Sequence, residues 1–176
     1  MWAFIAVGSN IEPERNICEA LRRLKDRVRV VGVSPFYRTL AVGSDGKIDV
    51  HASAFVNGVF EIETELTARE LKDGVLGPIE TALGRTRTAD KFAARTIDLD
   101  LVLYGDVVSG EPDLRLPHPD IRRRAFVAVP LAEIAPELVL PDTGEKLGGL
   151  AISKQREGIE ELGEFTRELR AVLVQG

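Results

Sequence analysis

The stretch that decides the fold runs Thr96-Ile97-Asp98-Leu99-Asp100-Leu101-Val102-Leu103-Tyr104. Its aliphatic, β-branched and aromatic residues favour a β-strand, in which Asp is otherwise disfavoured. Because side chains alternate along a strand, both carboxylates point from one face, about 6.6 Å apart. The other face is expected to be apolar and to consist of Ile97, Leu99, Leu101 and Leu103. Two like charges this close raise each other's pKa, so a positive group is expected between them.

The segment before this strand is basic. Four cations, Arg85, Arg87, Lys91 and Arg95, stand there against the single acid Asp90, in a chain whose net charge is −5. Paired carboxylates are typical ligands of Mg²⁺ when phosphates supply the remaining oxygens, and neighbouring cations suit the free phosphate oxygens. The pattern therefore predicts a binding site for a polyphosphate that carries a metal ion. The alternative left open is a solvated strand face that resists edge pairing.

Length and composition indicate one soluble globular domain over residues 1–176 that can bury a sizeable core. The chain is 44% hydrophobic and 29% charged. Its acidic balance argues against a general partner role for nucleic acid or an anionic membrane. A single cysteine, Cys18, excludes an internal disulfide and fits a cytoplasmic location. We expect a monomer and leave a dimer open.

Periodicity in the first half predicts alternating strands and helices. Strands are expected at 1–7, 28–38 and 54–64, and helices at 14–28 and 67–83. Thr67 and Glu70 have the spacing of a capping box, and Gly84 ends that helix. Residues 40–53 lack periodicity, which is more often seen in functional loops than in simple connections.

The second half predicts a hairpin and then helices. Gly105-Asp106 should turn the Asp-bearing strand into a short strand at Val107-Val108. Asp120 can cap a helix, Phe126 to Ile134 is apolar enough to be buried, and residues 153–176 predict an extra C-terminal helix. The order β-α-β-loop-β-α-loop-β-β-α-α favours an α+β fold with a mainly antiparallel sheet and helices packed on both faces. A doubly wound parallel sheet is disfavoured because no crossover helix fits before Ala54.

Several short motifs together resemble the 6-hydroxymethyl-7,8-dihydropterin pyrophosphokinase family of folate synthesis. Their order and spacing match from about Met1 to Pro141. The motifs lie at residues 6–10, 36–39, 55–57, 84–87, 95–100, 116–119 and 124–126. The resemblance implies a ferredoxin-like sandwich and the transfer of diphosphate from ATP to the hydroxymethyl group of the pterin, leaving AMP. It also implies two Mg²⁺ ions, bound with ATP and held by Asp98 and Asp100.

The resemblance assigns further residues to the two substrates. Arg85 and Arg95, with Asp98, are expected to be catalytic. Residues expected to contact ATP are Arg87, Phe92, His118 and Arg124. Residues expected to contact the pterin are Thr39, Leu40, Val42, Phe55, Asn57 and Phe126. A flat heteroaromatic ring suits two aromatic faces with amide groups at its edge.

The sequence departs from the family's usual pattern at two places, and two other functions are kept as alternatives to the kinase. Lys91-Phe92-Ala93-Ala94 stands where the family commonly has Arg-Trp-Gly-Pro, and Leu40 stands near a position where the family tends to have proline. Asn10 is expected to tie the first turn to the pocket wall rather than to touch substrate. The alternatives are a metal-dependent phosphodiesterase and a non-catalytic module that binds a small ligand; loss of AMP formation on replacing either aspartate would separate them from the kinase.

Overall fold

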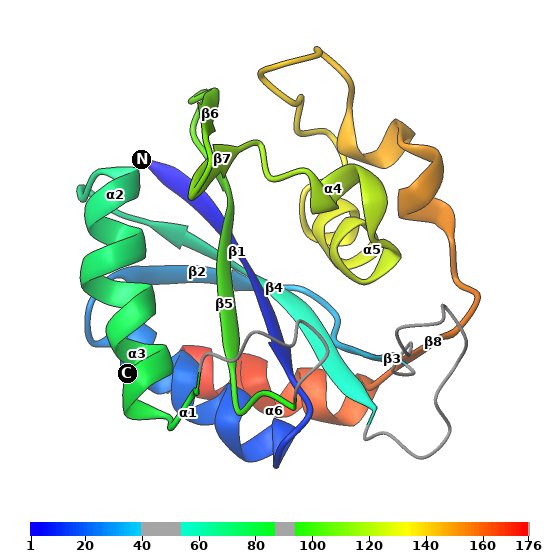
Figure 1. The fold of residues 1–176 in the computed structure, drawn as a ribbon. Helices are drawn as coiled ribbons and strands as arrows, with labels where there is room; N and C mark the ends of the chain where they lie inside the picture. The colour runs from blue at the N-terminus through cyan, green and yellow to red at the C-terminus, as the bar shows by residue number, and fades with distance from the viewer. Residues whose placement is uncertain (40–53, 87–93, 176) are drawn as a thin grey trace.

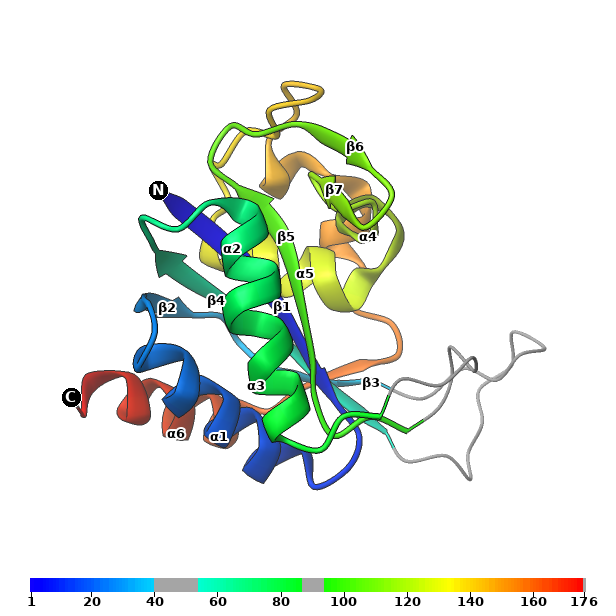
Figure 2. The same ribbon diagram turned by 60° about the vertical axis from the view of Figure 1, so that its left-hand side comes forward.

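A computed structural model describes residues 1–39, 54–86 and 94–175 of the protein. Within these ranges the chain forms a six-stranded sheet with helices on both faces, and a separate two-stranded sheet (Figures 1 and 2). The strands are β1 (Trp2–Ser9), β2 (Arg29–Val33), β3 (Tyr37–Thr39), β4 (Phe55–Glu63), β5 (Asp98–Tyr104), β6 (Ser109–Glu111), β7 (Leu114–Leu116) and β8 (Ile159–Glu161). The helices are α1 (Pro13–Lys25), α2 (Ala68–Leu71), α3 (Gly77–Ala82), α4 (Asp120–Arg123), α5 (Ala125–Ile134) and α6 (Gly163–Val174).

The large sheet is antiparallel, as the sequence predicted. Its order is β5-β1-β4-β3-β8, and β2 pairs with β4 beside β3. One hydrophobic core lies between the sheet and α1, α6 and the α2–α3 helix. A second core lies on the opposite face, against α5 (Figure 1). The α+β class and the placement of helices on both faces are therefore confirmed. No helix in the described ranges is long and apolar enough to cross a lipid bilayer.

The strand predicted at 28–38 is divided in two. Pro35 has no N–H to give to a strand ladder. Ser34 instead binds β4 twice: its N–H donates to Val59 O at 3.0 Å, and its hydroxyl accepts from Val59 N at 2.8 Å. The break leaves β3 as a short strand of its own beside β4.

The helix predicted at 67–83 is interrupted by a π-helical turn, Lys72–Leu76, between α2 and α3. The N–H of Gly77 there donates to Lys72 O, five residues back. Pro78 follows and lacks the N–H that an unbroken α-helix would use. The capping box at Thr67 and Glu70 is confirmed, and Gly84 ends the helix with φ +79°.

The prediction for one face of β5 is wrong at Leu103. The pairing of β1 with β5 shifts between Phe4 and Ile5, which face Leu103 and Leu101. This bulge inserts Val102 as an extra residue and reverses the alternation beyond it. Leu103 consequently packs in the core beside α5, whereas Leu101 packs in the core beside α1.

The predicted hairpin at Val107-Val108 is also wrong, because those residues are outside any strand and β6 pairs with β7.

The predicted C-terminal helix begins later than expected. Residues 151–154 form a 3₁₀ turn, β8 pairs with β3, and α6 begins only at Gly163. Gly158, with φ +75°, turns the chain into β8. Asp120 is the first residue of α4 rather than its cap, which is Pro119.

Candidate active site

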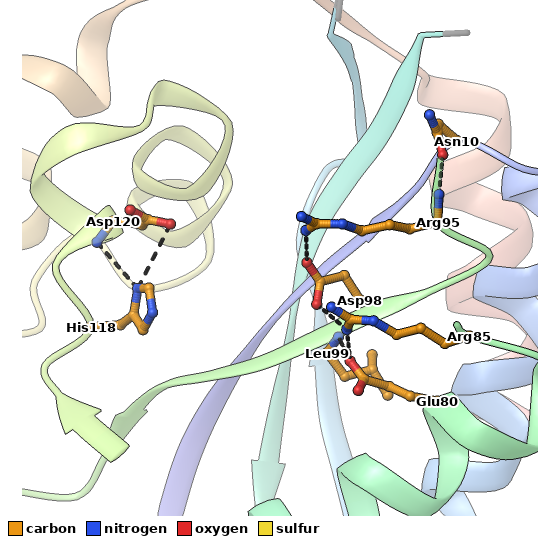
Figure 3. Close-up of polar contacts among 8 residues, drawn as sticks. All are labelled: Asn10, Glu80, Arg85, Arg95, Asp98, Leu99, His118 and Asp120. Atoms are coloured by element: carbon orange, nitrogen blue, oxygen red, sulfur yellow. Dashed lines mark hydrogen bonds and ion pairs between the residues drawn. The ribbon is translucent and has the colours of Figure 1, made fainter. Parts of the chain in front are cut away.

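Two arginines and one aspartate meet where β5 begins. Arg95 Nη1 donates to Asp98 Oδ2 at 2.6 Å, and Arg85 Nη1 donates to Asp98 Oδ1 (Figure 3). Both oxygens of Asp98 are therefore engaged by guanidinium groups. The three residues predicted to be catalytic thus come together in space.

Glu80 on α3 completes this cluster, and sequence reasoning missed it. Its side chain pairs with Arg85, and its Oε1 accepts the backbone N–H of Leu99 at 2.7 Å (Figure 3). β5 is the border strand of the sheet, so this carboxylate satisfies a strand N–H that no neighbouring strand could reach. A signal was present: Glu80 lies four residues after the buried Leu76 and therefore on the buried helix face.

Burial raises the pKa of Glu80, while the N–H of Leu99 and the charge of Arg85 act in the opposite direction. Asp100 lies two residues beyond Asp98 on β5, and its carboxyl group is surrounded by protein atoms where the walls of two cavities meet. Its pKa is raised to about 7, first by loss of hydration and then by the negative charges of Asp98 and Glu80. Three carboxylates, those of Glu80, Asp98 and Asp100, thus lie close enough to the two guanidinium groups of this cluster for their charges to act on one another.

Asn10 connects the turn after β1 to the backbone of Arg95, just before the cluster. Arg95 N donates to Asn10 Oδ1 at 2.6 Å, and Asn10 N donates to Arg95 O at 3.1 Å. Ser9 adds a bond from its hydroxyl to Thr96 O at 2.6 Å. The expectation that Asn10 ties the first turn to the site wall is confirmed by these bonds.

An open cavity of about 860 Å³ lies between the α2–α3 helix and the border of β5, and Glu80, Arg85, Asp98 and Asp100 are among its lining residues. A smaller cavity of about 110 Å³ adjoins it, because Lys72, Leu99 and Asp100 line both. His118 and Arg115 line the smaller cavity. Lys72 and Arg115 are two cations near the aspartates that the sequence interpretation did not single out.

His118 lies on the loop before α4, across from the strand that carries Asp98 (Figure 3), and it lines the smaller cavity together with Asp100. Its backbone N–H donates to Val102 O at 2.9 Å, which ties the loop to β5. Its Nδ1 accepts the N–H of Asp120 at 3.2 Å, so the other ring nitrogen, Nε2, is left to donate. Burial lowers the pKa of His118, against the raising effect of Asp120 and Asp98.

The residues predicted for the pterin are only partly described. Asn57 and Thr39 are buried neighbours, with Asn57 Nδ2 donating to Thr39 Oγ1 at 2.9 Å. Phe55 is half-buried at the start of β4, opposite Thr39. Phe126 is half-buried on α5 and packs against the second core. Arg124, predicted for ATP, is exposed at the N-terminal end of α5. Leu40, Val42, Arg87 and Phe92 lie outside the described residues.

Comparison with known proteins decides the family. A family model described as 7,8-dihydro-6-hydroxymethylpterin-pyrophosphokinase (HPPK) matches residues 4–136. The chain belongs to this family. Among curated relatives named 2-amino-4-hydroxy-6-hydroxymethyldihydropteridine pyrophosphokinase, the one from Pseudomonas aeruginosa is 39% identical over 163 residues, covering 90% of this chain and 95% of the relative.

Two further relatives carry the same name. The one from Haemophilus influenzae is 39% identical over 144 residues, covering 80% of this chain and 86% of the relative. The one from Bacillus subtilis is 35% identical over 164 residues, covering 90% of this chain and 94% of the relative. The resemblance drawn from the sequence motifs is therefore confirmed, and the HPPK-family match includes the Asp98–Asp100 strand and both arginines.

Proposed function

We propose that this chain transfers diphosphate from ATP to the hydroxymethyl oxygen of 6-hydroxymethyl-7,8-dihydropterin and releases AMP. The observation that carries the proposal is the convergence of Arg85 and Arg95 on Asp98, beside Asp100, at the mouth of the large cavity. The family membership supplies the reaction class.

In this reaction the pterin oxygen forms a bond to the β-phosphorus of ATP. The bond from that phosphorus to the oxygen shared with the α-phosphate breaks, and the hydroxyl proton is released. No covalent enzyme intermediate is required, so positioning and charge stabilisation account for the catalysis. We propose that Arg85 and Arg95 exchange their bonds to Asp98 for bonds to the phosphate oxygens, where guanidinium groups bind in a bidentate manner.

The donor set fits Mg²⁺. Asp98 and Asp100 offer carboxylate oxygens, the ligand type that Mg²⁺ prefers, and phosphates commonly complete its coordination. Within the described residues no group of three or more His, Cys, Asp or Glu side chains is arranged to hold a metal ion. Two ions bound with ATP would neutralise phosphate charge and help to orient the reacting oxygens. His118 would donate from Nε2 to a phosphate oxygen, with Arg124 nearby in sequence as a further cation.

For the pterin, we propose that Asn57 and Thr39 bind the polar edge of the ring and that Phe55 and Phe126 contact its faces. The buried amide of Asn57 supports this assignment because it bonds to Thr39 and lies across from Gly8, which in turn lies across from Asp98. Leu40 and Val42 at the rim, and Arg87 and Phe92 over ATP, stay predictions from the family resemblance.

The organisation proposed with this activity is one ferredoxin-like domain that acts as a monomer in the cytoplasm. The antiparallel sheet with helices on both faces supports the domain assignment. The single half-buried thiol of Cys18 is compatible with a reducing compartment.

The test is AMP formation from ATP, measured with and without 6-hydroxymethyl-7,8-dihydropterin, in Mg²⁺ and in excess chelator. Asp98→Ala and Asp100→Ala should each abolish pterin-dependent AMP formation, while Asp106→Asn, in the turn beyond the far end of β5, should leave it unchanged. Nucleotide hydrolysis that does not require the pterin would instead favour a phosphodiesterase. Activity that survives in both alanine variants would refute the proposed site.

A further inference from the structure

The C-terminal segment completes the sheet beside the strand that carries Thr39. β3 lies between β4 and β8, and Thr39 faces Phe55 on one side and Ile159 on the other. Figure 1 shows β8 alongside β3, with α6 returning beneath the sheet. One bond continues this pairing, from Leu162 N to Phe36 O at 2.8 Å. Residues 159–174 lie beyond the part of the chain that the HPPK family model matches.

Thr166 on α6 anchors the residue that leads into β3. Its side chain is buried, with 3% of the residue exposed, and its Oγ1 accepts the backbone N–H of Phe36 at 2.9 Å. The neighbouring Phe165 packs its ring edge-to-face on Phe36, with centroids 5.8 Å apart and planes at 81°. Phe36 is therefore held by a hydrogen bond and an aromatic contact from the same helix.

From Phe36 the contacts lead directly to the proposed pterin residues. The ring of Phe36 covers Gly58, where an added Cβ would lie only 2.5 Å from it. Gly58 follows Asn57 in β4, and the amide of Asn57 binds Thr39. On the other side, a Cβ on Gly8 would lie 2.8 Å from Asn57 Oδ1, so the backbone of β1 closely supports this amide.

We propose that β8 and α6 position the pterin-binding edge of the site, with Thr166 as the positioning residue that acts through Phe36 on Thr39 and Asn57. This inference rests on the proposed function. A ring edge is recognised by donors and acceptors that must be held within about 0.5 Å of the productive geometry. Among the described residues, β3 is a three-residue strand that pairs with β4 on one side and β8 on the other, so its position depends on both neighbours.

The experiment compares Thr166→Val with Thr166→Ser. Valine keeps the shape but leaves the buried N–H of Phe36 without its acceptor, whereas serine restores the hydroxyl. Tyr104→Phe is the matched control, because it removes the bond from Tyr104 Oη to Leu66 O at the far end of β5. Dissociation constants are measured by calorimetry for 6-hydroxymethyl-7,8-dihydropterin and, separately, for a non-hydrolysable MgATP analogue.

We expect Thr166→Val to weaken pterin binding by about 10-fold while nucleotide binding changes less than about 2-fold, with Thr166→Ser close to the parent. The Tyr104→Phe variant should be less stable yet bind the pterin normally. Pterin affinity unchanged in Thr166→Val overturns the inference. So does an equal loss of both affinities, which would indicate general destabilisation. If Thr166→Val does not fold, Phe165→Leu is judged by the same criteria.

Two further measurements distinguish a failure of this inference from a failure of the proposed function or of the proposed role of Asn57. If the parent protein neither binds the pterin nor forms AMP, the proposed function fails. If Asn57→Ala binds the pterin as the parent does, the assignment of Asn57 to the substrate fails, and the positioning role fails with it. Normal binding by the parent and weak binding by Asn57→Ala leave the outcome for Thr166→Val to decide the inference alone.

Discussion

Removing the carboxylate of Glu80 should destabilise the protein by about 2–4 kcal/mol. The side chains of Glu80 and Arg85 are only 7% and 17% exposed. Glu80→Ala leaves the backbone N–H of Leu99 without an acceptor, which costs about 1–3 kcal/mol when the group is buried. It also removes one of two carboxylates from Arg85, and this adds about 1 kcal/mol because Asp98 still neutralises the guanidinium.

Glu80→Gln separates these two contributions. Its amide oxygen can still accept from Leu99 N, so only the charge is lost. Burial of that charge raises the pKa of Glu80, so its removal offsets part of the lost ion pair and a decrease of no more than about 1 kcal/mol is expected. For a chain of this length, 1 kcal/mol corresponds to about 2–4 °C in melting temperature. Thermal unfolding followed by circular dichroism, with urea titration for the free energy, measures both variants. Glu65→Ala, at an exposed position, should change stability by less than about 0.5 kcal/mol.

Two results would refute this reasoning. A loss below about 1 kcal/mol in Glu80→Ala would mean that the strand N–H finds water or another partner at little cost. Equal losses in the alanine and glutamine variants would mean that the charge of Glu80, rather than its bond to Leu99, carries the stabilisation.

Further predictions concern charge, substrate and pH. In ligand-free protein with chelator, Asp98→Asn should lower the melting temperature because the negative charge that pairs with both arginines is lost, whereas Asp100→Asn should raise it by relieving repulsion; a shift of the same sign in both would contradict this. Asn57→Ala should raise the KM for the pterin by about 10-fold or more with an unchanged KM for ATP, and steady-state kinetics will show whether the two move together. Burial, with the charge of Glu63 second, raises the pKa of Glu61 above its ordinary 4.5, so its effect on stability becomes unfavourable as pH rises through the folded-state pKa. Glu61→Gln should therefore melt higher than the parent at pH 7 and match it well below pH 4.5; an advantage at both pH values would refute the titration argument.

Local patterns in the sequence predicted the local features well. The Asp-bearing strand and the capping box at Thr67 each depend on residues whose spacing specifies the interaction. The class of fold followed from the order of these elements. The two arginines and Asp98 could be expected to meet because they flank one loop and the strand that follows it.

Several errors arose where distant segments meet, whereas the breaks at Pro35 and before Pro78 had a local signal in the proline itself. Val102 forms a bulge where the pairing register between β1 and β5 shifts. The residue pattern within 96–104 contains no signal for this change of register. The spacing of Ile159, Phe165 and Leu169 predicted one helix. Ile159 instead lies in β8, which forms backbone hydrogen bonds with the edge of β3. Glu80 acquires its role only from the N–H of Leu99, nineteen residues later. Pairing partners of this kind are a tertiary property that periodicity along the chain does not encode.

The carboxylate of Glu80 has a consequence for association between molecules. An uncovered strand border invites another chain to dock and extend the sheet. Here a side chain from the protein's own helix occupies the hydrogen-bonding position that an incoming strand would need at Leu99. The bond from Leu99 N to Glu80 therefore discourages two molecules from associating by strand addition at this border of the sheet.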